Sequence, residues 1–147
     1  MKKLFIPLIC LVISVTSCKK EEKQDEKLSI YPESEIVDHH TSQNSLDWAG
    51  TYVGTLPCAD CSGIEITITL FKSGEFELEE EYIEMSYKST DRGTFEWNED
   101  GNSIVLHGEQ NKDPKFFKVG ENQIIHLDTK GNEITGNLSE AYILTKQ

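Results

Sequence analysis

The chain has 147 residues, which is room for one domain with a single core. Its formal net charge at pH 7 is −12, from 26 acidic and 14 basic side chains. This balance argues against nucleic acid as a partner, because nucleic-acid binding depends on Lys and Arg side chains that neutralise phosphates. An acidic surface most often serves solubility, so the charge by itself identifies no partner.

The first residues are typical of an export signal. Two lysines supply a positive start, and Leu4 to Val15 is an apolar stretch too short to remain in a bilayer as an anchor. The run Val15-Thr16-Ser17-Cys18 that follows is similar to a bacterial lipobox, in which a peptidase cuts before the cysteine and the cysteine carries lipid. We therefore expect a signal peptide at residues 1–17, a lipid on Cys18, and a membrane-bound protein of the bacterial cell envelope.

Residues 18–47 predict a flexible linker. The charged run from Lys19 to Lys27 has no apolar period, and the apolar residues after it are scattered and interrupted by Pro32. His39 and His40 fall in this segment, where adjacent histidines are more often bystanders than metal ligands. Such a linker would hold a folded domain, residues 48–147, away from the membrane.

From Trp48 onward apolar and polar residues alternate, which predicts half-buried strands. The expected strands are Ala49–Thr55, Ile64–Leu70, Glu75–Ile83, Thr94–Trp97, Ser103–His107, Lys115–Val119, Gln123–Asp128 and Ala141–Thr145. Turns rich in Gly, Asn and Pro separate them, and Glu84–Thr90 is expected to be a loop or a short strand. The pattern predicts an all-β fold of about eight short strands, an antiparallel meander closed into a barrel or sandwich.

Glu80 breaks this alternation. The pattern places it on the apolar face of its strand, with Phe76 and Leu78. Either a bulge shifts the register at this point, or the interior of the domain is partly wet.

The loop from Leu56 to Gly63 carries Cys58 and Cys61, separated by two residues. Three interpretations are open: a disulfide that pins the loop, a dithiol redox pair, or a clamp for a soft metal. Redox catalysis is the weakest of them. The loop runs into a strand and not into a helix, whose N-terminus would lower the pKa of a thiol, and Asp60 disfavours a neighbouring thiolate. In an oxidising compartment the default state of two adjacent thiols is a disulfide.

A metal site at this loop would suit a soft ion. A closed zinc site needs four ligands, and the sequence supplies one cysteine pair, to which only the fold can bring His107, His126 or Met85. Two thiolates suit Cu(I), which accepts a low coordination number. We therefore expect a metal or redox site at Cys58 and Cys61, with Cu(I) as the candidate cofactor.

The run from Tyr52 to Ile64, with Thr67 and Leu70 after it, closely resembles the signature of the N-terminal domain of the NlpE family of copper-resistance and envelope-stress lipoproteins. The resemblance implies a lipocalin-like barrel, attachment to the outer membrane, and a role in copper tolerance or in envelope-stress signalling with an envelope protein as partner. It places Cys58 and Cys61 on the family's Cys-x-x-Cys pair and Cys18 on its lipid site. Longer family members add a C-terminal domain with its own cysteine pair, and a signalling role of that domain is not carried over to this chain.

The sequence thus favours a non-enzymatic envelope lipoprotein that binds Cu(I) or senses thiol redox state. Two alternatives stay open. A barrel of lipocalin-like shape can carry a small apolar ligand or a lipid, and a cysteine pair can serve a thiol oxidoreductase. No nucleophile with its base, no phosphate loop and no acid pair stands out in the sequence.

Overall fold

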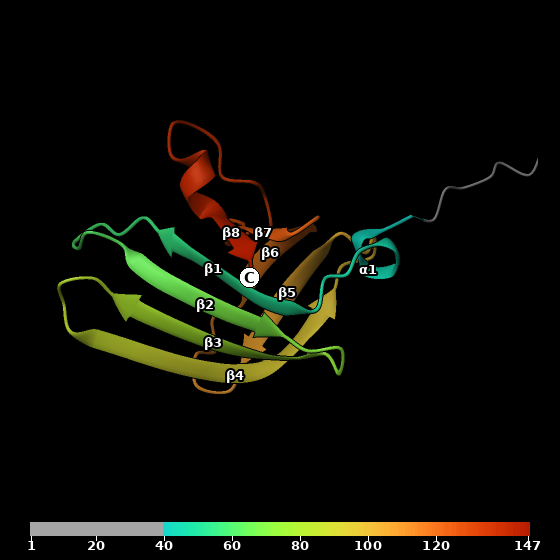
Figure 1. The fold of residues 1–147 in the computed structure, drawn as a ribbon, viewed down its shortest axis with the longest axis horizontal. Helices are drawn as coiled ribbons and strands as arrows, with labels where there is room; N and C mark the ends of the chain where they lie inside the picture. Colours follow the sequence, from blue (N-terminus) through green and yellow to red (C-terminus); the bar gives the residue numbers. More distant parts are fainter. Residues whose placement is uncertain (1–39) are drawn as a thin grey trace, which may run out of the picture. The chain divides into compact units, whose positions relative to one another are not determined.

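A computed structural model describes residues 40–147. The expected signal peptide, Cys18, His39 and most of the expected linker lie outside the described residues. The described part contains a closed barrel of eight antiparallel strands in chain order, with β8 pairing back onto β1 (Figure 1). The strands are β1 Gly50–Leu56, β2 Ile64–Leu70, β3 Glu75–Tyr82, β4 Tyr87–Trp97, β5 Ser103–Gly108, β6 Lys115–Gly120, β7 Gln123–His126 and β8 Ile143–Lys146. The all-β meander barrel expected from the sequence is confirmed.

The barrel forms because alternate residues along each strand are apolar and point to one side of the sheet. In β2, Ile66, Ile68 and Leu70 are buried, while the threonines between them are half-buried. The buried apolar side chains are Tyr52, Leu56, Ile66, Ile68, Leu70, Phe76, Leu78, Phe95, Ile104, Leu106, Phe117, Val119, Ile124, Leu127 and Leu144. All but Leu127 belong to one cluster, which is the core of the barrel.

The strand β4 is longer than the sequence predicted. The expected strand was Thr94–Trp97, but the structure extends it back to Tyr87, and this first half pairs with β3. The sequence gives a weak strand signal here because the positions that alternate with the exposed ones are Ser89, Asp91 and Gly93. These residues are polar or small, so no apolar period marks the strand.

Glu80 points inward without a bulge. Each residue of β3 from Phe76 to Tyr82 has one partner on β2 and one on β4, with no residue skipped on any of the three strands. The register is therefore regular through Glu80, which pairs with Ile66 on one side and Ser89 on the other. Of the two explanations open from the sequence, the partly wet interior is the one that the structure supports.

One end of the barrel is closed by the segment before β1. Residues Ser42–Ser45 form the short helix α1, although the sequence predicted no element before Trp48. The backbone N–H of Gln43 donates to the carbonyl of Gly101, and Ser42 Oγ donates to the carbonyl of Val119 over 2.7 Å. The helix is missing from the sequence pattern because four residues are too few for a helical period, and contacts with the barrel hold it in place.

Aromatic side chains pack under this helix. The ring of Trp48 meets those of Phe95 and Trp97 edge to face, with centroids 5.7 and 5.4 Å apart. The hydroxyl of Tyr52 donates to the carbonyl of Trp48, and burial together with the charge of Asp47 raises the pKa of Tyr52 to about 12. We call this the tryptophan end of the barrel. No helix within residues 40–147 is long and apolar enough to cross a membrane.

Candidate functional site

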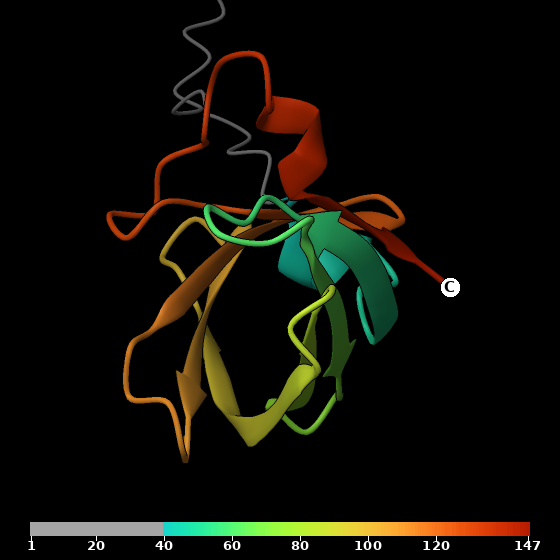
Figure 2. The same cartoon turned by 90° about the vertical axis from the view of Figure 1, so that its left-hand side faces the viewer.

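The cysteine loop lies at the opposite end, where it joins β1 to β2. Figure 2 looks at the barrel from this end, which we call the cysteine end. Cys58 and Cys61 form a disulfide, with their Cα atoms 5.3 Å apart. Both residues are half-buried, while Ala59 and Asp60 between them are exposed. The sulfur atoms are therefore held on a loop at the rim of the barrel and not inside its core.

The loop is held against the turn between β3 and β4. The N–H of Ile83 donates to the carbonyl of Gly63 over 3.0 Å, and Ser62 Oγ donates to Glu84 Oε2 over 2.7 Å. A side chain at Gly63 would not fit, because its Cβ would lie 2.7 Å from Thr55 Cγ2. Glycine at position 63 thus lets the cysteine loop pass close to Thr55 on β1.

One contact concerns the chemistry of the cysteines directly. The Sγ atom of Cys61 lies 3.3 Å from the carbonyl oxygen of Gly63. A disulfide sulfur carries no hydrogen, so this is a van der Waals contact in the oxidised loop. On reduction, the thiol of Cys61 has a hydrogen-bond acceptor already in place at the carbonyl of Gly63.

The other residues considered as metal ligands lie in different places. His107 is exposed on the outside of β5, and His126 points into the barrel from β7. Met85 is exposed in the turn that contacts the cysteine loop. His40 is exposed beside α1, where its ring contacts Ser45 Oγ. Within residues 40–147, no group of three His, Cys, Asp or Glu side chains is placed to hold a metal ion.

Charged residues line the inside of the cysteine end. Lys115 Nζ lies 3.1 Å from Glu80 Oε1, and the two side chains are only 24% and 14% exposed. Ser89 Oγ donates to the other oxygen of Glu80 over 3.3 Å. An ion pair removed from water in this way costs desolvation energy that its attraction does not always repay. The interior of this end is therefore polar where the other end is apolar.

Asp91 organises the loop that follows β5. Its carboxylate accepts the backbone N–H groups of Arg92, Gln110 and Asn111 over 2.8 to 3.0 Å. Partial burial works to raise the pKa of Asp91, but the backbone hydrogen bonds outweigh it and hold the pKa below its usual value. The loop thus closes the barrel wall beyond the point where β4 and β5 stop pairing.

His126 completes the inner surface. Its ring packs against Phe117 edge to face and stacks on Tyr142, with centroids 5.1 and 6.1 Å apart. Burial lowers the pKa of His126, and the nearby charge of Lys115 lowers it further against the opposing effect of Glu80. The Nδ1 atom is buried without a hydrogen-bond partner among the described residues.

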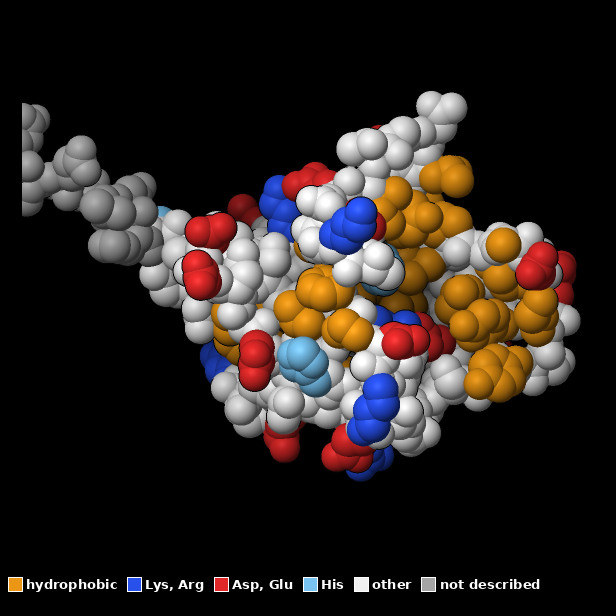
Figure 3. All heavy atoms as spheres, turned by 180° about the vertical axis from the view of Figure 1, so that it is seen from behind, with side chains coloured by type: hydrophobic (Ala, Val, Ile, Leu, Met, Phe, Trp, Pro, Cys, Tyr) orange, Lys and Arg blue, Asp and Glu red, His pale blue; other side chains and the backbone are white. Residues whose placement is uncertain are grey.

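Two cavities of about 360 Å³ lie on strands β3 and β4. One is at the cysteine end, where Glu80, Ser89, Tyr82 and Tyr87 line it. On the face seen in Figure 3, acidic and basic side chains lie between groups of hydrophobic ones.

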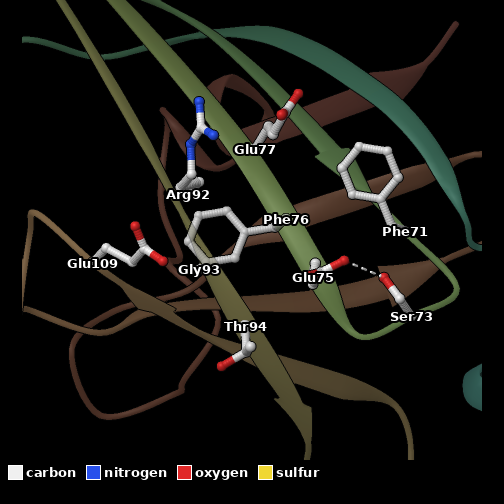
Figure 4. A pocket seen from close by; sticks show the side chains of 9 residues that line it. All are labelled: Phe71, Ser73, Glu75, Phe76, Glu77, Arg92, Gly93, Thr94 and Glu109. Carbon is white, nitrogen blue, oxygen red and sulfur yellow. Dashed lines mark hydrogen bonds between the residues drawn. The ribbon is translucent and has the colours of Figure 1, made fainter.

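The second cavity lies on the outside, near the turn after β2. Figure 4 shows Arg92 beside Glu77 there, and the hydrogen bond between Ser73 and Glu75.

Sequence reasoning missed most of the polar inner surface. It noted Glu80 and named His126 only as a possible metal ligand, and it did not place Lys115, Ser89 or Asp91 on this surface. Lys115 carried a usable signal, because it alternates with Phe117 and Val119 and therefore shares their inward face. The partner of an inward charge on a distant strand depends on how the barrel closes, and the sequence pattern does not contain that information.

Comparison with known proteins identifies the family. The model of the NlpE N-terminal domain matches residues 52–137, which is more than half of the chain. The chain is 28% identical over 82 residues to the lipoprotein NlpE of Escherichia coli, a match that covers 55% of this chain and 34% of the relative. It therefore spans about a third of the length of that relative.

Solved structures agree with this match. A candidate lipoprotein from Shewanella oneidensis has 44% sequence identity and a TM-score of 0.66, covering 73% of this chain and 95% of that one. The Cpx pathway activator NlpE from Escherichia coli has 28% identity and a TM-score of 0.51, covering 60% of this chain and 46% of that one. With the barrel, the cysteine loop and these matches together, the chain belongs to the family of the NlpE N-terminal domain.

Proposed function

We propose that the protein is a non-enzymatic lipoprotein of the bacterial cell envelope that binds Cu(I) through reduced Cys58 and Cys61, and that the disulfide is the form without copper. The observation that carries this proposal is the pair of half-buried cysteines on a loop fixed to the barrel rim. Occupancy of the site would then report both the copper level and the thiol redox state of the envelope.

The two residues fit a soft cation. Their Cα atoms are 5.3 Å apart, so both sulfur atoms can turn toward one ion without a change of fold. Thiolates bind Cu(I) in preference to the hard cations that carboxylates bind. The disulfide must first accept two electrons and two protons from a dithiol reductant, which gives two thiols. Cu(I) binding then releases both thiol protons.

A titration tests the copper proposal. The full-length chain in detergent, with Cys10→Ser and Cys18→Ser, keeps only the loop cysteines as thiols. After reduction we expect it to take up one Cu(I) in competition with a chromophoric Cu(I) chelator. The same chain with Cys58→Ser and Cys61→Ser in addition should lose that uptake. Equal uptake by the two chains would contradict the proposal.

The second part of the proposal is the anchor. The Escherichia coli relative is described as a lipoprotein, and Cys18 stands at the end of a signal-like segment. We propose that residues 1–17 are removed, that Cys18 carries lipid, and that a linker connects it to the barrel at the outer membrane. Cell fractionation tests this. Cys18→Ser should remove the protein from the outer-membrane fraction, and a variant that stays in that fraction would exclude the anchor.

A third part concerns a protein partner. The Escherichia coli relative is described as an activator of the Cpx pathway. This supports an envelope protein as partner of this chain also. Cross-linking in intact cells, followed by identification of the captured protein, tests it. We expect a defined envelope protein whose capture changes between wild type and the double variant Cys58→Ser, Cys61→Ser, and capture that is the same in both would contradict a role of the loop.

The observed interior weighs against the two alternative functions. The buried cluster around Tyr52 and Phe117 packs part of the interior, and the cavity at the cysteine end is lined by Glu80, Ser89 and Asp91, which suit an apolar ligand poorly. The cysteine loop joins two strands, so it lacks the helix N-terminus that activates a thiol in disulfide exchange. We expect the wild-type protein to reduce insulin disulfides no faster than the variant Cys58→Ser, Cys61→Ser does. A clearly faster rate would favour the oxidoreductase.

A further inference from the structure

Met85 lies in the turn that is bound to the cysteine loop. Glu84, the residue before it, accepts the hydrogen bond of Ser62, and Ser62 directly follows Cys61. Ile83 is bound through its backbone to Gly63 on the same loop. The chain therefore holds a thioether side chain on the segment adjacent to the two cysteine sulfurs.

The turn that carries Met85 has an unusual backbone. Glu84 has φ of 70° and Ser86 has φ of 50°, so both neighbours of Met85 are in the left-handed region that non-glycine residues rarely adopt. Such conformations persist where the surrounding structure holds them, and they cluster at functional sites. The hydrogen bond from the N–H of Met85 to the carbonyl of Tyr82 closes this turn.

The Met85 side chain is also more exposed than packing would require. Its exposed fraction is 46%, and it is one of four large hydrophobic side chains that are exposed within residues 40–147. The chain has two methionines, and the other is Met1. A flexible, soft thioether with three rotatable bonds is thus free to turn toward the neighbouring loop.

We propose that Met85 is a third sulfur ligand of the Cu(I) site, an inference that rests on the proposed binding of Cu(I) by Cys58 and Cys61. Two thiolates and one Cu(I) carry a net charge of −1, next to the carboxylates of Asp60 and Glu84 on the same two segments. A thioether adds a soft ligand without adding charge, whereas a third thiolate or a carboxylate would increase the repulsion.

The histidines are poorer candidates for this role. His107 is exposed on the outer side of β5, and the ring of His126 is packed between Phe117 and Tyr142 inside the barrel. Among the hydrogen bonds between residues 40 and 147, none joins the segment of either histidine to the cysteine loop. Met85 is the soft ligand whose own turn is bound to that loop.

The test uses the reduced full-length chain with Cys10→Ser and Cys18→Ser. Met85→Leu should weaken Cu(I) binding about tenfold or more, because the chemistry of the side chain changes and its volume hardly does. Tyr87→Leu changes a neighbouring exposed residue and should leave the affinity unchanged. X-ray absorption at the copper edge should show three sulfur neighbours in the parent chain and two in Met85→Leu.

A second measurement does not depend on the folding of a variant. With ¹³C-methyl methionine in the parent chain, addition of Cu(I) should shift the Met85 methyl signal, and the double serine variant should show no shift. An unchanged affinity in Met85→Leu, two sulfur neighbours in the parent chain, or an unshifted methyl signal while Cys58 and Cys61 still bind Cu(I), would overturn the role of Met85 alone. If the parent chain binds no Cu(I), the proposed function itself is wrong.

Discussion

The two ends of the barrel are built from the same strands but carry different side chains on their inner faces. At the tryptophan end, Trp48, Phe95 and Trp97 pack on one another under α1. At the cysteine end, Glu80 and Lys115 form an ion pair in the interior. Apolar packing stabilises the fold, while interior charges lower its stability unless each is paired. The difference indicates that the first end supports the fold and that the second is available for binding.

The largest effect should come from the apolar core that both ends share. Phe117 is fully buried, so Phe117→Ala removes apolar contacts and leaves a cavity, and the free energy of unfolding should fall by about 3–5 kcal/mol. Phe71 is 39% exposed, and Phe71→Ala is the matched control with a much smaller loss. Urea denaturation of both variants measures the difference. Equal losses would remove the distinction between a packed interior and the surface.

The ion pair at the cysteine end should respond in a different way. Glu80→Leu leaves Lys115 without its partner in a mostly buried position, which should cost about 2 kcal/mol of unfolding free energy. The double variant Glu80→Leu, Lys115→Leu should recover most of that loss, because two apolar side chains need no partner. If the double variant is as unstable as the single one, the desolvation of these two charges does not limit the stability of the cysteine end.

Loss of the disulfide should have a smaller effect. It closes a loop of only a few residues, so its removal costs about 2 kcal/mol at most in the chain-entropy estimate. Cys58→Ser with Cys61→Ser should therefore leave a folded barrel, which keeps the tryptophan bands of the near-ultraviolet circular dichroism spectrum. A double variant that unfolds would mean that the loop is structural, and the reduced copper-binding form would then not exist.

The same contrast explains what could be predicted from the sequence. The strands that face the core, such as β2 with its alternating Ile and Leu, were predicted with nearly the observed limits. For the first half of β4 the sequence predicted either a loop or a short strand over Glu84–Thr90, because Ser89 and Asp91 line a polar interior and give no apolar period. The helix α1 was missed because contacts with Gly101 and Val119, distant in sequence, hold it.

The cysteine loop shows a similar limit. Its place between two strands followed from the sequence, since the alternating runs on both sides of it are clear. Its contact with the turn of Glu84 depends on how β2 and β3 pair, and that register sets which residue of the turn lies near the loop. Reading the residue types alone therefore identified Cys58 and Cys61 but left Met85 as one of three alternatives.

The smallest expected effect concerns pH and His126. Burial holds the pKa of His126 below its unfolded value of about 6.5, so the unfolded chain binds more protons than the folded one between the two values. Stability from the neutral ring is fully present above the unfolded pKa and is lost as the pH falls through the folded pKa. His126→Gln removes this proton uptake, so its melting temperature should fall less between pH 7.5 and 5 than that of the parent chain.

His107→Gln alters an exposed histidine on the outer surface and is the matched control, for which the parent's pH dependence should persist. If the two variants lose the pH dependence equally, the cysteine end does not bury a histidine in its neutral form, and the contrast between the two ends is then one of packing alone.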